Sequence, residues 1–214
     1  MTSILERWFP FTKRAEPLQP GMYASQPAPD APIPYRLHLR LEPDGSGVLL
    51  VNAATVLHLN ASAAAHALEL IRGVPPEAAA AAVRRRFRVS RGRALADQQE
   101  LRQQILRLAT QPDLDPVVFL GMERQEPRAT RPSAPYRLDL ALTYATDPDG
   151  ALDPQASRRV DRELTTDEWK GLLKSAWAAG IPHVTFTGGE PTRRPDLAEL
   201  VAYAQDLGQV SGLL

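Results

Sequence analysis

From position 35 to position 41 the chain alternates between apolar and polar residues with a period of two. The apolar set is Tyr35, Leu37, Leu39 and Leu41, and the polar set between them is Arg36, His38 and Arg40. This period predicts a half-buried strand, with the leucines on the buried face. Two further strands are expected at Val48 to Val51 and at Thr55 to Leu59.

The pattern then changes to helical spacing in three successive segments. Asn60 is a favoured N-cap residue and Gly73 a typical stop, so a helix is expected between them. A second helix is expected from the prolines at 75 and 76 to about Phe87, because proline suits the first helical turn. A third runs roughly from Gly92 to Ala109 and places Leu101, Ile105 and Leu108 on its buried face. Residues 35–110 therefore predict an α+β domain of three strands and three helices.

Proline-rich segments flank this domain on both sides. Residues 1–34 contain seven prolines and are expected to form a tail, without a long helix or a central strand. Residues 111–135 contain five more and predict a domain linker.

Strand and helix patterns alternate from residue 136 to residue 214. Strands are expected at Tyr136 to Tyr144, His183 to Thr187 and from Gln209 onward, with helices at Thr166 to Ala179 and Pro195 to Leu207. Thr165 and Glu168 predict a capping box at the start of the first of these helices. Repeated βα units favour a parallel sheet, here a partial (β/α) barrel segment.

Composition narrows the function classes. The 25 basic and 25 acidic side chains give a net charge of zero, which argues against a general attraction to nucleic acid or to membranes. No apolar run is long enough to cross a bilayer or to act as a secretion signal, so a cytoplasmic location is expected. The chain has no cysteine, which excludes thiolate nucleophiles and thiolate metal sites.

The clearest candidate for ligand chemistry is the string Thr187, Gly188, Gly189, Glu190 and Pro191. It is expected at the carboxyl end of a parallel strand, where α/β folds bind ligands. The glycines allow close backbone approach, exposed amides suit a carboxylate, and Glu190 suits an ammonium group. An amino-acid moiety satisfies both requirements, while an ordinary turn with a solvated glutamate remains an equal alternative.

Together with its flanks from Leu164 to Lys170 and from Gly180 to Thr192, this string resembles the first two βα units of radical S-adenosylmethionine enzymes. The resemblance implies that residues 187–191 contact the methionyl part of S-adenosylmethionine. It also implies a CxxxCxxC loop after the first strand, whose thiolates hold a [4Fe-4S] cluster. Here the corresponding segment, 145–156, contains no cysteine, so we expect no such cluster and no catalytic residue on this chain.

The N-terminal domain resembles the small peptide-chaperone domain of pyrroloquinoline quinone biosynthesis, the precursor-peptide recognition element. The residues that carry this resemblance are Val48 to Asn52 and Thr55 to Asn60. It implies a winged-helix-like fold and β-augmentation by a leader peptide. The implied binding edge is Thr55, Val56, Leu57, His58 and Leu59, with exposed side chains of the helix at 92–109 as the second wall. The alternative is that the chain's own tail or linker covers this edge.

Other sites are weaker. Asp147, Asp149 and Asp153 do not follow the calcium-loop spacing and predict a turn, and no metal site is expected. The histidines at 38, 58, 66 and 183 stand apart and are expected on strand or helix surfaces.

The principal hypothesis is a peptide-binding or scaffold component in peptide or cofactor maturation. Two alternatives remain open. One is an incomplete piece of a radical S-adenosylmethionine enzyme that retains the cofactor, and the other is a winged-helix protein that binds nucleic acid through six arginines between positions 84 and 93.

Overall fold

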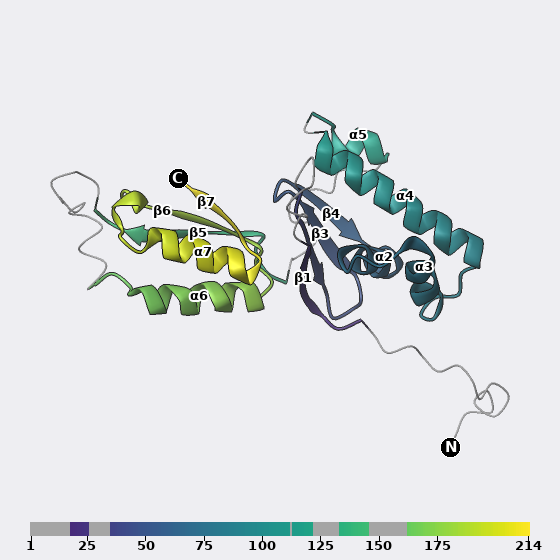
Figure 1. Cartoon of the computed structure of the whole chain (residues 1–214), viewed down its shortest axis with the longest axis horizontal. Coiled ribbons are helices and arrows are strands. Elements are labelled where there is room, and N and C mark those ends of the chain that lie inside the picture. The colour runs from purple at the N-terminus through teal and green to yellow at the C-terminus, as the bar shows by residue number, and fades with distance from the viewer. Residues whose placement is uncertain (1–17, 26–34, 112, 122–132, 146–161) are drawn as a thin grey trace, which may run out of the picture.

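The computed structural model describes residues 18–25, 35–111, 113–121, 133–145 and 162–214. It forms a mixed α/β structure with two sheets, one antiparallel with four strands and one parallel with three. The antiparallel sheet and helices α2–α5 form one unit, and the parallel sheet with α6 and α7 forms the other (Figure 1). No helix in these ranges has the length and apolarity to span a bilayer.

The antiparallel sheet has the order β1-β2-β3-β4. Its strands are β1 (Gly21–Ser25), β2 (Leu37–Leu41), β3 (Gly47–Val51) and β4 (Thr55–Leu59). The expectation of three strands was wrong, because β1 lies within the segment expected to be a tail. Five residues between Pro20 and Pro27 suffice for a strand, and an edge position tolerates flanking prolines.

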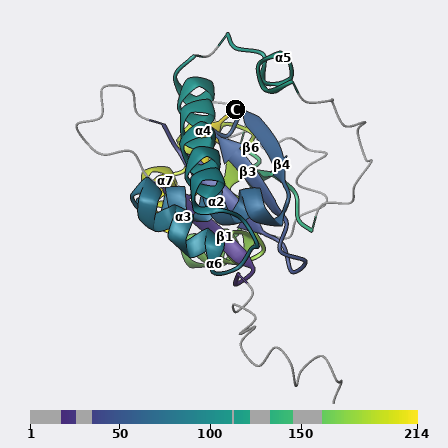
Figure 2. The ribbon, with the colours of Figure 1, turned by 90° about the vertical axis from the view of Figure 1, so that its right-hand side faces the viewer.

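Four helices accompany this sheet: α2 (Ala61–Ile71), α3 (Pro76–Arg84), α4 (Arg91–Thr110) and the short α5 (Pro116–Leu120). The first three match the predicted helices, and the Asn60 side chain caps α2 by accepting from the Ala63 amide. Leucines of β2 and β3 pack with Ala64 and Leu68 of α2 and with Ile105 and Leu108 of α4. In the end-on view of Figure 2 the helices α2, α3 and α4 lie together, and α4 contacts β3 of the sheet.

The parallel sheet has the order β5-β6-β7, formed by Arg137–Thr143, His183–Gly188 and Val210–Leu213. Helices α6 (Thr166–Ala178) and α7 (Leu197–Leu207) follow β5 and β6, and η1 (Pro191–Arg193) is a single 3-10 turn. The predicted parallel βα order is therefore confirmed. Leu140, Leu142, Val184 and Phe186 pack against Trp169, Leu173, Leu200 and Ala204 of the two helices.

The polar face of β2 is not solvent-exposed, contrary to the expectation of a half-buried strand. His38 and Arg40 are 1% and 3% exposed, because this face packs against the parallel unit. The His38 Nε2 lies 2.7 Å from the Gly208 carbonyl oxygen, and Arg40 Nη1 donates to the carbonyls of Ala134 and Gly180. The expectation of surface histidines was also wrong for His66, which is buried against the Gln98 side chain. Buried polar contacts thus join two units that are distant in sequence.

Candidate functional site

The carboxyl ends of β5 and β6 lie side by side and point away from the antiparallel unit (Figure 1). The predicted ligand string follows β6 directly, so the structure brings Thr187 to Pro191 to this edge. Thr187 and Gly188 end the strand, and Pro191 begins η1. This is the edge at which parallel α/β sheets bind ligands.

The two glycines make a close approach to the chain itself. The Gly189 amide donates to the Thr143 carbonyl, and the Glu190 amide donates to the Ala145 carbonyl. A Cβ on Gly188 would overlap the Thr143 carbonyl oxygen, and one on Gly189 would overlap that of Ala145. Gly188 also has a φ of 121°, which disfavours other residues. The string thus joins the end of β6 to the end of β5.

The backbone amides that were predicted to bind a carboxylate are therefore already hydrogen-bonded within the fold. We expected exposed amides for a carboxylate, but the amides of Gly189 and Glu190 already have carbonyl partners. The predicted partner for an ammonium group remains: Glu190 is exposed at this edge, and its Oε1 accepts from the Thr192 amide and hydroxyl at 3.0 and 2.6 Å. These hydrogen bonds lower the pKa of the Glu190 carboxyl, which favours the anion that an ammonium group requires.

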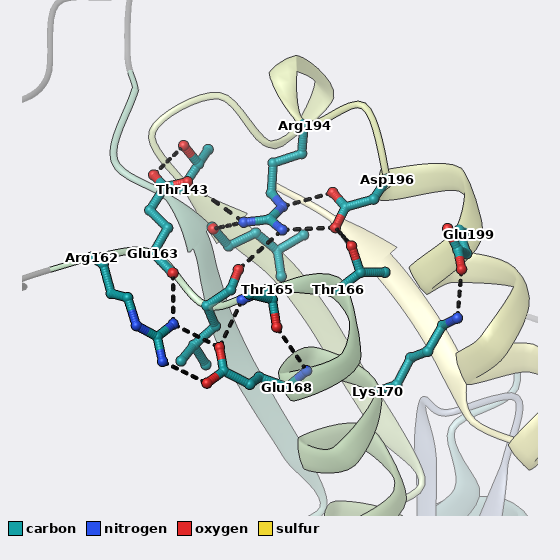
Figure 3. Close-up of polar contacts among 12 residues, drawn as sticks. Thr143, Arg162, Glu163, Thr165, Thr166, Glu168, Lys170, Arg194, Asp196 and Glu199 are labelled. Atoms are coloured by element: carbon teal, nitrogen blue, oxygen red, sulfur yellow. Dashed lines mark hydrogen bonds and ion pairs between the residues drawn. The ribbon is translucent and has the colours of Figure 1, made fainter.

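Arg194 organises the segments around this edge (Figure 3). It makes a two-point contact with Asp196, with Nε and Nη2 at 2.9 and 2.7 Å from the carboxylate oxygens. Its remaining hydrogen bonds go to the carbonyls of Leu142, at the end of β5, and Leu164, before α6. The Arg194 side chain is 11% exposed. Arg194 therefore holds β5, α6 and α7 together at one point.

Two carboxylates complete this network. Asp196 also accepts from the Thr166 hydroxyl, and the contacts with Arg194 and Thr166 hold its pKa at about 2. Glu163 Oε1 accepts from the Thr143 hydroxyl and the Tyr144 amide at 2.7 and 2.9 Å, while its Oε2 lies 3.5 Å from Arg194. Glu163 therefore links the end of β5 to the arginine.

The start of α6 carries a second, exposed ion pair in the same figure. Arg162 donates to both carboxylate oxygens of Glu168, and Oε2 of Glu168 also accepts from the Thr165 amide. The Thr165 hydroxyl oxygen in turn accepts from the Glu168 amide. The predicted capping box is thus confirmed. These contacts hold the pKa of Glu168 at about 2.

Arg194, Asp196 and Glu163 are not among the site residues predicted from the sequence. A signal for the first two exists in the local order Arg-Pro-Asp, because it places a guanidinium and a carboxylate two residues apart at a helix start. Glu163 carries no such signal, since its partners Tyr144, Thr143 and Arg194 lie 19, 20 and 31 residues away. Asp147, Asp149 and Asp153 lie outside the described residues. Within the described ranges no three acidic or histidine side chains gather as a metal site.

The predicted peptide edge is the second candidate site. β4 ends the antiparallel sheet and pairs only with β3, and in the described part of the chain no further backbone hydrogen bond occupies its outer side. Leu57 is buried, His58 is exposed, and the other three residues are intermediate. Leu106 of α4 is 47% exposed.

A segment of this chain is similar in sequence to proteins named PqqA peptide cyclase. No family model matches the chain. It is 43% identical over 79 residues to a "PqqA peptide cyclase" of Bradyrhizobium diazoefficiens and 44% identical over 79 residues to one of Rhodopseudomonas palustris. Each match covers 37% of this chain and 19% of the relative. The chain thus spans about a fifth of the length of these curated relatives.

A more distant structural match covers most of the chain. Streptococcus suis SuiB superposes with a TM-score of 0.45 at 20% identity, over 83% of this chain and 39% of SuiB. The TM-score is 0.46 for SuiB bound to S-adenosylmethionine and 0.41 for SuiB bound to precursor peptide SuiA. Similarity at this level does not establish a shared fold.

Proposed function

We propose that this chain is a peptide-binding component of peptide or cofactor maturation, in which β4 accepts a precursor peptide as an added strand. The observation that carries the proposal is the outer edge of β4, which in the described part of the chain has no backbone partner. An extended peptide gains main-chain hydrogen bonds from such an edge. The relatives named PqqA peptide cyclase support a peptide as the partner.

The domain assignment belongs to the same proposal. Residues 35–110, together with β1 from the preceding segment, act as a winged-helix-like, PqqD-type recognition domain, and residues 111–135 connect it to the start of a (β/α) barrel at 136–214. Leu106, partly exposed on α4, provides an apolar contact for the peptide beside β4. The strand β1 adds to the opposite edge of the sheet, so it does not occupy the outer side of β4.

Hydrogen exchange tests this binding mode directly. We expect a synthetic PqqA peptide to slow amide exchange in Thr55–Leu59, because added-strand pairing occupies the outward amides. β1 at Gly21–Ser25 is the matched control, since it is the other edge of the same sheet. Equal protection of both edges, or protection of neither, contradicts the proposal.

A pair of substitutions provides a second readout. Leu106→Glu should weaken peptide binding about tenfold in a calorimetric titration, because a carboxylate replaces a partly exposed apolar contact. Leu213→Glu is the control, since Leu213 is 55% exposed in β7 of the other unit. Equal affinity of both variants for the peptide would exclude α4 from the peptide-binding site.

S-adenosylmethionine is the ligand proposed for the carboxyl edge, at Thr187, Gly188, Gly189, Glu190 and Pro191. Glu190 fits the ammonium group, while the amides at 189 and 190 leave the carboxylate to other donors. Calorimetry with S-adenosylmethionine should give heat for the wild type and at least tenfold weaker binding for Glu190→Gln. Equal heats for the two proteins would remove Glu190 from the site.

A [4Fe-4S] cluster does not fit the residues of this chain. Its irons require thiolate ligands, and the sequence contains no cysteine. No radical step is therefore assigned. Anaerobic reconstitution with iron and sulfide is the test, and a stable cluster absorbance in the purified protein would contradict this part of the proposal.

A further inference from the structure

We infer that the arginines at the α3–α4 junction form a docking surface for an acidic segment of the bound peptide. This surface, the arginine ridge, consists of Arg84, Arg85, Arg86, Arg88, Arg91 and Arg93. The inference rests on the proposed function, since it assigns the ridge to the peptide that β4 accepts.

The ridge concentrates positive charge in an otherwise acidic chain. Positions 84–93 contain six arginines and no acidic residue, and the whole chain has a net charge of zero. The remaining residues therefore carry a net charge of −6. An acidic ligand would meet attraction at this surface and net repulsion from the rest of the chain, which gives the ridge its specificity.

Three of the six guanidinium groups of the ridge have no partner in the described part of the chain. All six arginines are exposed. Arg93 forms an ion pair with Asp97, Arg84 Nε donates to the Val89 carbonyl, and Arg86 also has an interaction partner. Among the described residues, the side chains of Arg85, Arg88 and Arg91 have no hydrogen bond or ion pair. Their guanidinium groups are available for carboxylates, which they bind in a two-point geometry.

The placement of the ridge also disfavours the helix that carries it. Arg91 and Arg93 lie in the first turn of α4, which contains no acidic residue. Cations at a helix N-terminus oppose the helix dipole. A bound carboxylate would relieve both this repulsion and that between neighbouring arginines.

The backbone of the ridge is held in place by local contacts. The amides of Arg86 and Phe87 donate to the Val83 carbonyl, the Val89 amide donates to Phe87, and Ser90 caps α4. Phe87 and Val89 are partly buried. The arginines are therefore displayed on an ordered turn, which lowers the entropic cost of binding.

The position of the ridge suits a peptide on β4. The ridge lies at the N-terminal end of α4, a helix that packs on the sheet containing β4, and on the side of this unit away from the parallel sheet (Figures 1 and 2). α4 has 20 residues and is therefore about 30 Å long, a distance that about nine extended residues cover. The acidic segment should thus lie within about ten residues of the segment paired with β4.

Fluorescence anisotropy with two peptides tests the inference. The probes are labelled (Glu-Gly)6 and (Gln-Gly)6, which differ only in charge. We expect at least tenfold tighter binding of the glutamate peptide at low salt, and loss of this preference in Arg85→Glu/Arg88→Glu. The control, Arg102→Glu/Lys174→Glu, changes the net charge by the same amount at exposed residues of α4 and α6 and should retain the preference.

The outcomes separate the ridge from the β4 site. Equal binding of both peptides, equal losses in both double variants, or tighter binding of a labelled dT20 oligonucleotide would overturn the inference. If the ridge variant loses the glutamate peptide while PqqA peptide gives no protection of β4, the proposed function fails and the ridge stands. If PqqA peptide protects β4 but the glutamate peptide is not preferred, the proposed function stands and the inference about the ridge fails.

Discussion

Arg40 and Arg194 are both nearly buried arginines that donate to backbone carbonyls, yet they hold different parts of the molecule together. Arg40 lies in β2 and contacts residues 94 to 140 positions away, whose carbonyls belong to the parallel unit. Arg194 contacts Asp196 two residues away and carbonyls of β5 and the α6 start. One arginine joins two units, and the other organises one edge of a single unit.

This difference separates structural from functional consequences. The carbonyl partners of Arg40 carry no formal charge, and among the described residues Glu42, whose side chain is 18% exposed, is its one carboxylate partner. Arg40 Nη2 has no hydrogen-bond partner within the described ranges. Arg194 instead lies between two carboxylates beside the candidate ligand edge. Loss of Arg40 should therefore weaken the packing between the two units, whereas loss of Arg194 should disturb the structure of the candidate ligand edge.

Removal of Arg40 should have the largest effect. Arg40→Ala leaves the Ala134 and Gly180 carbonyls without their donor in a buried interface, and we expect about 3 kcal/mol less unfolding free energy. Denaturant unfolding measures this loss. Arg102→Ala, exposed on α4, should change the value by less than about 0.5 kcal/mol. Similar losses in both variants would show that Arg40 does not join the units.

Arg194→Lys should have the next largest effect and lower the free energy of unfolding by about 2 kcal/mol. An ammonium group cannot reproduce the planar guanidinium that donates to Asp196 and to two backbone carbonyls. Amide exchange should rise at Leu142 to Ala145. Arg162→Lys is the matched control, since Arg162 makes an equivalent two-point contact with Glu168 on the surface. It should cost less than about 0.5 kcal/mol, and an equal cost would contradict the special role of burial.

Acid should weaken the same edge. The pKa of Asp196 is held at about 2 in the folded chain, below the usual value of 3.8, so its contribution is complete above pH 4 and is lost as the pH falls toward 2. Asp196→Asn should therefore lower stability by about 1 kcal/mol at pH 7 and by much less near pH 2. Melting temperatures of both proteins across this range measure the effect. A difference that is independent of pH would contradict the ion pair.

The smallest effect is expected from the protonation of His38, which lies at the same interface as Arg40. Burial lowers the pKa of His38, although its hydrogen bond to the Gly208 carbonyl acts in the opposite direction, and the nearby cations Arg36 and His183 lower it further. Stability is thus complete above about pH 6.5 and falls as His38 becomes protonated. Trp177, whose ring meets His38 edge-on at 6.2 Å, should report this change by fluorescence. His38→Gln should abolish the titration, and His58→Gln, exposed on β4, should retain it.

The amino-acid sequence by itself determined most of the secondary structure. Local signals suffice for α2, α3, α4, α6 and α7, because caps, glycine stops and apolar spacing act within a few residues. The same holds for the parallel order of β5, β6 and β7, since βα repeats leave few alternatives. The position of the Gly-Gly-Glu-Pro string at a strand end also followed from its neighbours.

The tertiary structure alone decided how polar groups are used. Alternation in β2 indicated one solvated face, but a second unit covers it, so His38 and Arg40 are buried. β1 escaped prediction because its pairing with β2 depends on residues far along the chain. The amides at 189 and 190 looked available until the end of β5 supplied carbonyls. Each of these depends on contacts distant in sequence, which local patterns do not encode.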